Sequence, residues 1–421
     1  MGCNGKKLLF LGGPIQVIKA VEQAKKMGVY TIVTDMKDNA LAKKPADEAL
    51  SFGVTDIEGI VSWCREHSVD GVLNFGVDPA QKSNIVICDA LGLPHFGTLE
   101  QVDYLSNKQA FKNMCVECGV DVIQSYSEEE ITDEFSDFPI LVKPAQNCGS
   151  RGSSVCRNRP EALQGIENAR NSSADGKVVI EKYMEGYQDF SVEYYVVDGE
   201  AFLVRTQDRY LGKKEDKLER QAVAGISPSK HTDMYLKNVH PRVVKMLKHI
   251  GVTNGVLTMQ GFIDGDTVRF YDPAYRFPGS AYEKHLATAT GVNLMEYAIA
   301  FALGEQKEAV PELNNAYKLN GNCSIMLLFT AKPGIISECR GFEEVKNVPG
   351  VVSAVLKEAV GSVVPESGDV NQRIAEVGLV VKDDKKTIED AVLEVQSKFT
   401  VLDEKGENML VSLADPRLFR S

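Results

Sequence analysis

The chain contains 421 residues, of which 43% are hydrophobic and 25% are charged. This is the composition of folded globular proteins, and at about 150 residues per domain the length predicts two to four domains. Acidic residues outnumber basic residues by 59 to 47, which gives a net charge of −12. Phosphate backbones and anionic lipid surfaces repel such a chain, so its composition argues against binding to nucleic acids or membranes.

The cysteines and the apolar segments indicate in which cellular compartment the protein is located. The nine cysteines are spread along the chain, as is usual for proteins of a reducing environment. No apolar run approaches the roughly 20 residues that cross a bilayer. The first apolar stretch is interrupted by Gly12, Gly13 and Pro14, which does not fit a signal peptide. We therefore expect a cytoplasmic protein.

Short apolar segments alternate with helix-length amphipathic segments over residues 1–100, which predicts a parallel α/β sheet. The expected strands are 8–12, 30–35 and 70–76, and the expected helices are 15–28, 58–67 and 80–91. Asp35 ends the second strand, where dinucleotide-binding folds hold a ribose. The first turn reads Gly12-Gly13-Pro14-Ile15-Gln16-Val17 instead of G-x-G-x-x-G, so an NAD-dependent oxidoreductase is disfavoured.

The middle of the chain reads as a mixture of strands and helices. We expect helices over 107–119 and 240–250, strands over 138–158 on both sides of a Gly/Ser-rich loop, strands over 178–186 and 190–209, and a strand pair over 255–276. Asp198-Gly199 is a hairpin signal. After a polar stretch near 305–322 the pattern restarts, which predicts a separate α+β domain with a helix over 387–399.

Lys143 ends an apolar strand and precedes the Gly/Ser-rich loop 146–154. Backbone N–H groups of such a loop can approach phosphate oxygens, and a neighbouring lysine supplies positive charge. The loop does not have the G-x-x-x-x-G-K-[ST] pattern of a P-loop. Taken alone, it could equally be a flexible hairpin.

The order of the polar residues around this loop carries more information than the loop itself. The residues are Lys108, Lys143, Glu181, Asp189, Gln260, Asp272 and Arg276. In this order and context the sequence resembles the ATP-grasp superfamily along nearly its whole length, including segment 287–305, which looks like the helix that closes the grasp domain. The resemblance implies an α/β and α+β chain with an N-terminal domain over 1–100, an ATP-grasp domain over 101–305 with a mobile lid at about 134–195, and a C-terminal domain over 306–421.

The resemblance also implies the nucleotide contacts. Lys108 and Lys143 would contact the α- and β-phosphates of ATP, and Asp189 would hold the ribose hydroxyls. Residues 181–184 would line the adenine. The contacts in that segment would be Glu181, Tyr183 and Met184, and those in the loop would be Gly149, Ser150, Gly152 and Ser153.

The metal site departs from the family pattern, in which a Glu on one strand is followed by Glu-x-Asn before Pro-Arg on the next. Here the matching residues are Gln260, then Asp272-Pro273-Ala274 before Tyr275-Arg276. Mg²⁺ prefers oxygen ligands and often retains several waters, so one carboxylate and a triphosphate can suffice. We expect Asp272 to be the principal ligand of Mg²⁺ (or Mn²⁺), bridging two metal ions at the β- and γ-phosphates, with Gln260 as a weaker neutral ligand and a modest metal affinity.

Arg276 matches the arginine that the superfamily directs at the transferring γ-phosphoryl group, where charge develops. Asp272 and Arg276 are therefore the expected catalytic residues. Arg205, and with less support Arg209 and Arg220, could collect a substrate carboxylate or be ordinary exposed arginines. His285 could face the pocket or be a buried structural histidine.

The reaction implied by the resemblance is carboxylate–amine ligation. A substrate carboxylate attacks ATP to give an acyl phosphate and ADP, and an amine then displaces phosphate to form an amide. The expected substrates are a small carboxylate, such as an amino acid, and an amine, and relatives suggest a homodimer. A bicarbonate-using carboxylase and a non-catalytic ATP-binding protein remain alternatives.

Overall fold

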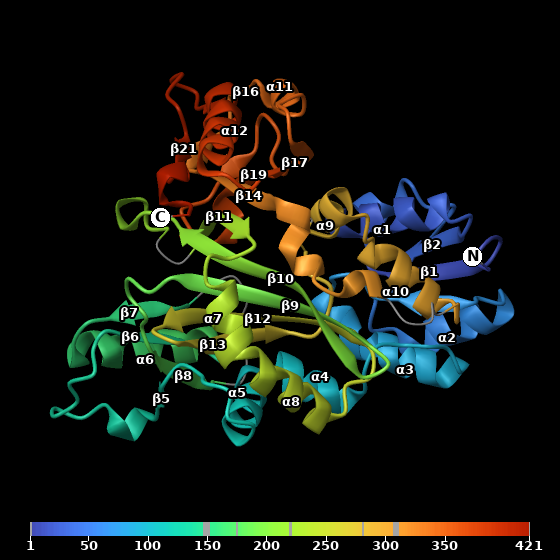
Figure 1. The fold of residues 1–421 in the computed structure, drawn as a ribbon, viewed down its shortest axis with the longest axis horizontal. Coiled ribbons are helices and arrows are strands. Elements are labelled where there is room, and N and C mark those ends of the chain that lie inside the picture. The colour runs from blue at the N-terminus through green and yellow to red at the C-terminus, as the bar shows by residue number, and fades with distance from the viewer. Residues whose placement is uncertain are drawn as a thin grey trace.

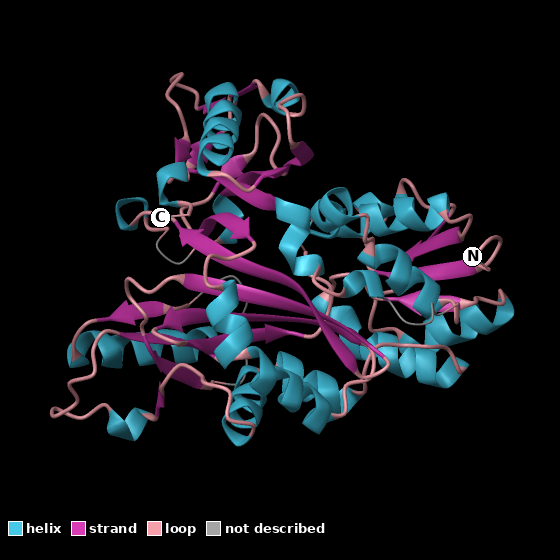
Figure 2. Ribbon diagram, in the orientation of Figure 1, coloured by secondary structure: helices cyan, strands magenta, loops and turns pink. Residues whose placement is uncertain are grey.

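The structure, a computed structural model, describes residues 2–145, 152–173, 176–218, 221–279, 282–305 and 311–420. Smaller α/β regions surround the long strands of one large sheet (Figures 1 and 2). The mixed α/β class predicted from the sequence is confirmed. None of the helices in these ranges combines the length and apolar character that a bilayer span requires.

The N-terminal region is a parallel sheet with the strand order β3-β2-β1-β4. The strands are β1 (Lys7–Leu11), β2 (Tyr30–Thr34), β3 (Glu48–Leu50) and β4 (Gly71–Leu73), and the helices are α1 (Ile15–Lys26), α2 (Ile57–Glu66) and α3 (Gln81–Leu91). Side chains of β1 alternate between two cores, because successive strand residues face opposite sides. Leu8 and Phe10 pack with α1, whereas Leu9 and Leu11 pack with α2 and α3.

A small antiparallel sheet, with the order β5-β8-β6-β7, carries the region predicted to be a lid. Its elements are β5 (Ser125–Tyr126), β6 (Ile140–Pro144), β7 (Ser154–Cys156), α6 (Arg159–Ser172) and β8 (Val178–Lys182). It follows helices α4 (Leu99–Ser106) and α5 (Lys108–Glu117). The next strand, β9 (Asp189–Val197), belongs to the large sheet, so the small sheet ends before residue 195.

The large sheet begins with the order β13-β12-β9-β10-β11. The further strands are β10 (Glu200–Leu211), β11 (Ala222–Ser227), β12 (Gly255–Asp264) and β13 (Thr267–Ala274), and α7 (Thr232–Asn238) and α8 (His240–Ile250) connect β11 to β12. The predicted turn between β9 and β10 is present. Asp198 and Gly199 both have positive φ, 48° and 80°, as a two-residue hairpin turn requires.

Strands from the C-terminal part of the chain extend this same sheet. Strand β14 (Asn322–Ala331) pairs with β11 in antiparallel register, for example Ala224 with Leu327. It is followed by β19 (Arg373–Lys382) and β17 (Val351–Leu356), and β21 (Leu410–Val411) pairs with the end of β14. The C-terminal region was predicted as a separate domain, but its sheet is continuous with the central one, since β11 is buried along its whole length and would otherwise be an unpaired edge.

Helices α9 (Tyr282–Thr290) and α10 (Leu294–Ala302) lie between the large sheet and the N-terminal region (Figure 1). Residues of α1 and α10 share one core cluster with strands of both sheets. The remaining C-terminal elements are β15 (Gly334–Ile335), β16 (Glu338–Arg340), α11 (Phe342–Val345), β18 (Val363–Val364), α12 (Lys385–Lys398) and β20 (Thr400–Leu402).

Candidate active site

A cavity of about 810 Å³ lies where these regions meet. Residues of α5, the small sheet, the large sheet and the C-terminal strands line it. This volume is typical of sites for small molecules and cofactors. Most of the residues predicted to bind ATP line it: Lys108, Lys143, Ser153, Glu181, Tyr183, Met184, Asp189, Gln260, Asp272 and Arg276.

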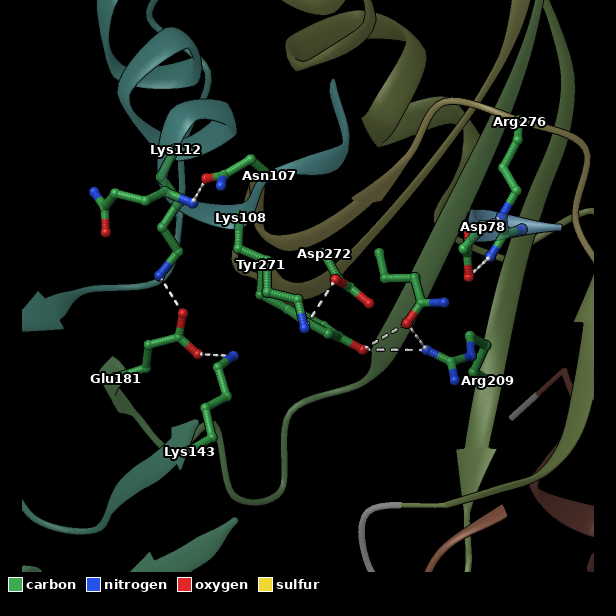
Figure 3. A network of polar contacts seen from close by, with 12 residues as sticks. Asp78, Asn107, Lys108, Lys112, Lys143, Glu181, Arg209, Tyr271, Asp272 and Arg276 are labelled. Atoms are coloured by element: carbon green, nitrogen blue, oxygen red, sulfur yellow. Dashed lines mark hydrogen bonds and ion pairs between the residues drawn. The ribbon is translucent and has the colours of Figure 1, made fainter. Parts of the chain in front are cut away.

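At one end, two lysines share a single buried carboxylate (Figure 3). Lys143 on β6 and Lys112 on α5 both form ion pairs with Glu181 on β8. The Glu181 side chain is only 2% exposed. Burial alone would raise its pKa, but the two ammonium groups outweigh burial and the pKa is lowered. The three side chains carry a net charge of +1 in a nearly dry place, which suits a phosphate group.

Lys112 was not predicted from the sequence. It follows Lys108 by four residues, so both lie on the same face of α5. Its ammonium group also donates to Ser125 Oγ at 2.8 Å, and burial lowers its pKa despite Glu181. In the sequence, Lys112 lies next to the apolar positions Phe111 and Met114 of an amphipathic helix. This position could have indicated that the Lys112 side chain is buried.

Lys108 is the first residue of α5 and faces the same cavity. The side chain of Asn107 caps the helix by accepting hydrogen bonds from the backbone N–H groups of Gln109 and Ala110, both at 3.0 Å. The Lys108 ammonium lies 3.3 Å from a carboxylate oxygen of Asp272 on β13. Because Lys108 is the first residue of α5, the partial positive charge of the helix N-terminus lies next to the charge of its ammonium group.

A row of polar side chains crosses four neighbouring strands. Arg209 on β10 lies opposite Asp189 on β9 and forms an ion pair with it at 3.0 Å. The same Nη1 atom donates to Gln260 Oε1 on β12 at 2.8 Å and to the Tyr271 hydroxyl on β13 at 3.2 Å. Burial raises the pKa of Asp189 to about 6, although Arg209 acts in the opposite direction.

A bulge places two successive residues of β13 in this cavity. Gln260 pairs with Asp272 and Gly261 pairs with Phe270, so Tyr271 is the extra residue. Gly261 permits the close approach, because a Cβ atom there would lie 2.7 Å from the carbonyl oxygen of Arg269. Tyr271 and Asp272 both line the cavity as a result, whereas a regular strand would direct them to opposite faces.

The predicted adenine segment follows β8. The Tyr183 amide donates to the Pro139 carbonyl at 3.0 Å, and the Tyr183 carbonyl accepts from the Glu185 amide at 2.9 Å. Among the described residues, no hydrogen bond engages the Met184 amide. The Met184 amide is thus the backbone donor of this segment that could meet a ligand. Glu181 turns its carboxylate toward the two lysines.

Two of the predicted loop residues, Gly149 and Ser150, lie outside the described residues. Gly152 has φ +68°, and a Cβ atom there would lie 2.8 Å from the Ser172 Cβ atom. Ser153 lines the cavity. The nucleotide contacts of all four residues stay a prediction.

Arg276 lies at the wall of the cavity and forms a two-point ion pair with Asp78 of the N-terminal region (Figure 3). Its Nη1 atom also donates to the backbone carbonyl of Phe277 at 2.9 Å. The side chain is 21% exposed, so the guanidinium is accessible from the cavity. Its role at the γ-phosphate stays a prediction.

The C-terminal strands contribute a second shared carboxylate, which the sequence did not indicate. Glu376 on β19 lies 2.5 Å from the Lys357 ammonium and 3.3 Å from the Arg373 guanidinium. All three residues line the cavity. Burial lowers the pKa of Arg373, Glu376 opposes this, and the positive charge of Arg209 lowers it further. This group also carries a net charge of +1.

Arg205 and His285 are both buried beside the cavity. Arg205 forms an ion pair with Glu193 at 2.9 Å and lies 4.6 Å from the centre of the Tyr282 ring. Burial raises the pKa of Glu193 to about 7. His285 hydrogen-bonds to Ser324 Oγ at 2.7 Å and to Ser353 Oγ at 3.2 Å, as a structural histidine does.

The residues expected to hold Mg²⁺ fit it only in part. Asp272 offers an accessible carboxylate. The oxygen of Gln260 already accepts hydrogen bonds from Arg209 and Tyr271, and a cation would have to share that place with a guanidinium. Within the described ranges, no group of three or more His, Cys, Asp or Glu side chains could hold a metal ion.

Known proteins share this architecture. Residues 106–310 match the family model of the carbamoyl-phosphate synthase L chain, ATP binding domain. The chain is 23% identical over 342 residues to the carbamoyl phosphate synthase large chain of Clostridium beijerinckii, an alignment that covers 75% of this chain and 31% of the synthase. The chain thus spans about a third of the length of that relative.

Solved structures resemble nearly the whole chain, among them the following two. An L-amino acid ligase from Bacillus licheniformis superposes with a TM-score of 0.76 at 16% identity, over 95% of this chain and 99% of the ligase. The biotin carboxylase domain of a Hydrogenobacter thermophilus 2-oxoglutarate carboxylase, a domain dimer solved with MgADP and bicarbonate, gives 0.70 at 20% identity, over 96% of this chain and 91% of that one.

The matched family model defines the class of the central part of this chain, residues 106–310, as an ATP-binding domain. More particularly, that domain is of the carbamoyl-phosphate synthase L chain type, and the chain as a whole shares the fold of the solved ligase and carboxylase structures. The resemblance predicted from the order of the motifs is confirmed.

Proposed function

We propose that the protein is an ATP-dependent ligase that joins a small carboxylate, such as an amino acid, to an amine through an acyl phosphate. The observation that carries the proposal is the charge distribution in the cavity. Two places, one around Glu181 and one around Glu376, each hold one carboxylate between two basic side chains. The other basic side chains of the described cavity wall are each paired with a carboxylate. They are Lys108, Lys182, Arg205, Arg209 and Arg276.

Two net-positive places in one cavity suit two anions that would repel each other in water. The first lies within the matched ATP-binding domain and faces the same cavity as Lys108 at the N-terminus of α5, so we assign it to the phosphates of ATP. We assign the second, around Arg373, to the substrate carboxylate. Holding both anions in contact lowers the entropic cost of bringing them together, and positive charge lowers their repulsion.

In the proposed reaction a carboxylate oxygen attacks the γ-phosphorus of ATP, and the bond to the β,γ-bridging oxygen breaks to release ADP. The Arg276 guanidinium stabilises the charge on the transferring phosphoryl oxygens. The amine then attacks the acyl carbon, loses a proton to solvent, and expels phosphate. Asp272 is the protein carboxylate that would hold a nucleotide-bound Mg²⁺, which would neutralise part of the phosphate charge.

A bicarbonate-using reaction is the second candidate, because the 2-oxoglutarate carboxylase domain that shares the fold was solved with bicarbonate. The two candidates differ in what triggers ADP release. The ligase requires both a carboxylate and an amine for sustained turnover, whereas the alternative needs only bicarbonate and its acceptor. A cytoplasmic location and a homodimer complete the proposal.

The test is an ADP-release screen of small carboxylates crossed with amines, with bicarbonate as a separate arm. We expect turnover with at least one carboxylate–amine pair, and its loss in Lys143→Ala and Arg276→Ala. The control is Lys386→Ala, which removes a surface lysine with an 84% exposed side chain. ATP binding without turnover on any pair would favour a non-catalytic protein. Full activity of either cavity variant would refute the site.

A further inference from the structure

Arg209 occupies a place in the cavity that a metal ligand would need. Gln260 has a single amide oxygen, and that oxygen accepts from Arg209 Nη1 at 2.8 Å and from the Tyr271 hydroxyl at 3.1 Å. A divalent cation at Gln260 would lie against a guanidinium, and like charges at that distance repel strongly in a partly buried site. The geometry therefore opposes Gln260 as a metal ligand.

The guanidinium is held from one side only. Its hydrogen bonds to Gln260 and Tyr271 and its ion pair with Asp189 all use Nη1. Within the described part of the chain, Nη2 and Nε form no hydrogen bond, and neither is among the enclosed polar atoms without a partner. Since Arg209 lines the cavity, these donors are open to a ligand there.

The position of Arg209 places it along the path of a phosphate tail. The ammonium of Lys108 lies 3.3 Å from Asp272, and the charge of Asp272 acts in turn on Arg209, whose pKa it helps to raise. Figure 3 shows Asp272 between Lys108 on one side and Arg209 on the other. An anion that extends from the Lys112–Glu181–Lys143 group past Asp272 reaches Arg209.

We propose that Arg209 is a nucleotide ligand that takes the place of a second divalent cation, so that the centre binds one metal ion with its nucleotide instead of two. This inference rests on the proposed ATP site. In it, Nη2 and Nε donate to non-bridging phosphate oxygens, while Gln260, Tyr271 and Asp189 fix the plane of the guanidinium. A planar guanidinium can donate two parallel hydrogen bonds to such oxygens, and its charge does not depend on metal concentration.

The first measurement is the number of bound metal ions. Mn²⁺ is titrated against the full-length protein saturated with the non-hydrolysable analogue AMP-PNP, and free Mn²⁺ is followed by electron paramagnetic resonance. We expect one bound Mn²⁺ per chain. Gln260→Glu should still bind one, because Arg209 pairs with the new carboxylate, whereas Arg209→Met combined with Gln260→Glu should bind two. Two ions in the unaltered protein, or one in the double variant, would overturn the proposal.

The second measurement separates Arg209 from metal binding altogether. AMP-PNP affinity is determined by calorimetry in the presence of EDTA. We expect Arg209→Met to weaken it about tenfold, as loss of charge-assisted hydrogen bonds does. The matched control is Arg242→Met, which breaks an Arg–Asp pair outside the cavity and should bind normally.

Unchanged affinity of Arg209→Met would refute the role of Arg209. If the unaltered protein bound no AMP-PNP even with Mn²⁺, the proposed function would itself have failed. The two failures are thus distinguishable, and the metal count of the unaltered protein decides the matter even where a variant does not fold.

Discussion

Arg276 and Asp78 lie 198 residues apart in the sequence and meet in a two-point ion pair at the wall of the cavity. Arg276 follows β13 of the large sheet, and Asp78 follows the last strand of the N-terminal sheet. The N-terminal region therefore holds the guanidinium that the proposed reaction needs. The 68% exposed Asp78 side chain leaves this pair open to competition from an entering phosphate.

Arg276→Lys keeps the charge but removes the planar pair of donors. We expect kcat to fall about 100-fold, the scale of losing a transition-state hydrogen-bond donor. ATP affinity should change little, because the proposed nucleotide site assigns ATP binding mainly to the lysines at Glu181. Steady-state kinetics and calorimetry check this. Arg269→Lys on β13, which pairs with Asp264, is the control and should be fully active. An equal loss in both variants would contradict the assignment.

Glu181→Gln leaves two buried ammonium groups without their shared carboxylate. Removal of one partner from a buried ion pair costs about 3–5 kcal/mol, because an uncompensated charge stays buried. We expect the free energy of unfolding to fall by roughly this amount in urea denaturation. Glu185→Gln, in which a half-exposed pair with Arg157 is lost, should cost much less, because solvent screens an exposed ion pair. If both variants lost the same free energy of unfolding, the burial of Glu181 would not contribute to the cost of its removal.

The sequence predicted the parts of the site that local motifs encode. Lys143 before its loop, Asp272 on its strand and Arg276 after that strand were predicted from the family resemblance of the sequence, and the structure brings them into one cavity. The pairing and the register of the strands that bring the site residues together could not be predicted from local motifs. Arg209 meets Gln260 only because β9 lies between their strands and brings both side chains over one face of the sheet.

The C-terminal contribution was missed for a related reason. Lys357 and Arg373 lie in a region that reads as a separate domain, since its pattern restarts after a polar stretch. They reach the cavity because β14 pairs with β11 and β19 pairs with β14. Strands about 100 residues apart pair because the pairing buries the edge of a sheet. The alternation of apolar and polar residues within a strand does not identify the strand with which it pairs.

Arg373→Met tests the proposed place of the substrate carboxylate. The variant keeps much of the side-chain volume but leaves Lys357 and Glu376 as a neutral pair, so the place loses its net positive charge. We expect KM for the carboxylate to rise about tenfold or more, the scale of one charge-assisted hydrogen bond, with KM for ATP unchanged. Arg340→Met, on the exposed strand β16, is the control. A rise in KM for ATP instead would assign this group to the nucleotide.

His285 gives the fold a measurable dependence on pH. Burial, supported by the charges of Lys19, Arg205 and Lys284, lowers the pKa of His285 to about 3, whereas an unfolded histidine titrates near 6.5. Between these values the unfolded chain binds more protons than the folded one, so this group makes stability rise with pH. Above about pH 6.5 His285 is neutral in both states and the free energy of unfolding is not reduced. As the pH falls from 6.5 toward 3, protonation of the unfolded histidine lowers the free energy of unfolding progressively.

His285→Asn removes this titration but can retain a hydrogen bond to Ser324 or Ser353. The quantity to measure is the free energy of unfolding of the unaltered protein minus that of the variant, from urea curves between pH 4 and pH 8. Other buried groups, such as Glu193 with its pKa near 7, act on both proteins and cancel in the difference. We expect the difference to be constant above about pH 6.5 and to decrease steadily below it. A difference independent of pH would mean that His285 has the same pKa in the folded and unfolded chains, and a difference that increased as the pH fell would mean that His285 is protonated in the folded protein.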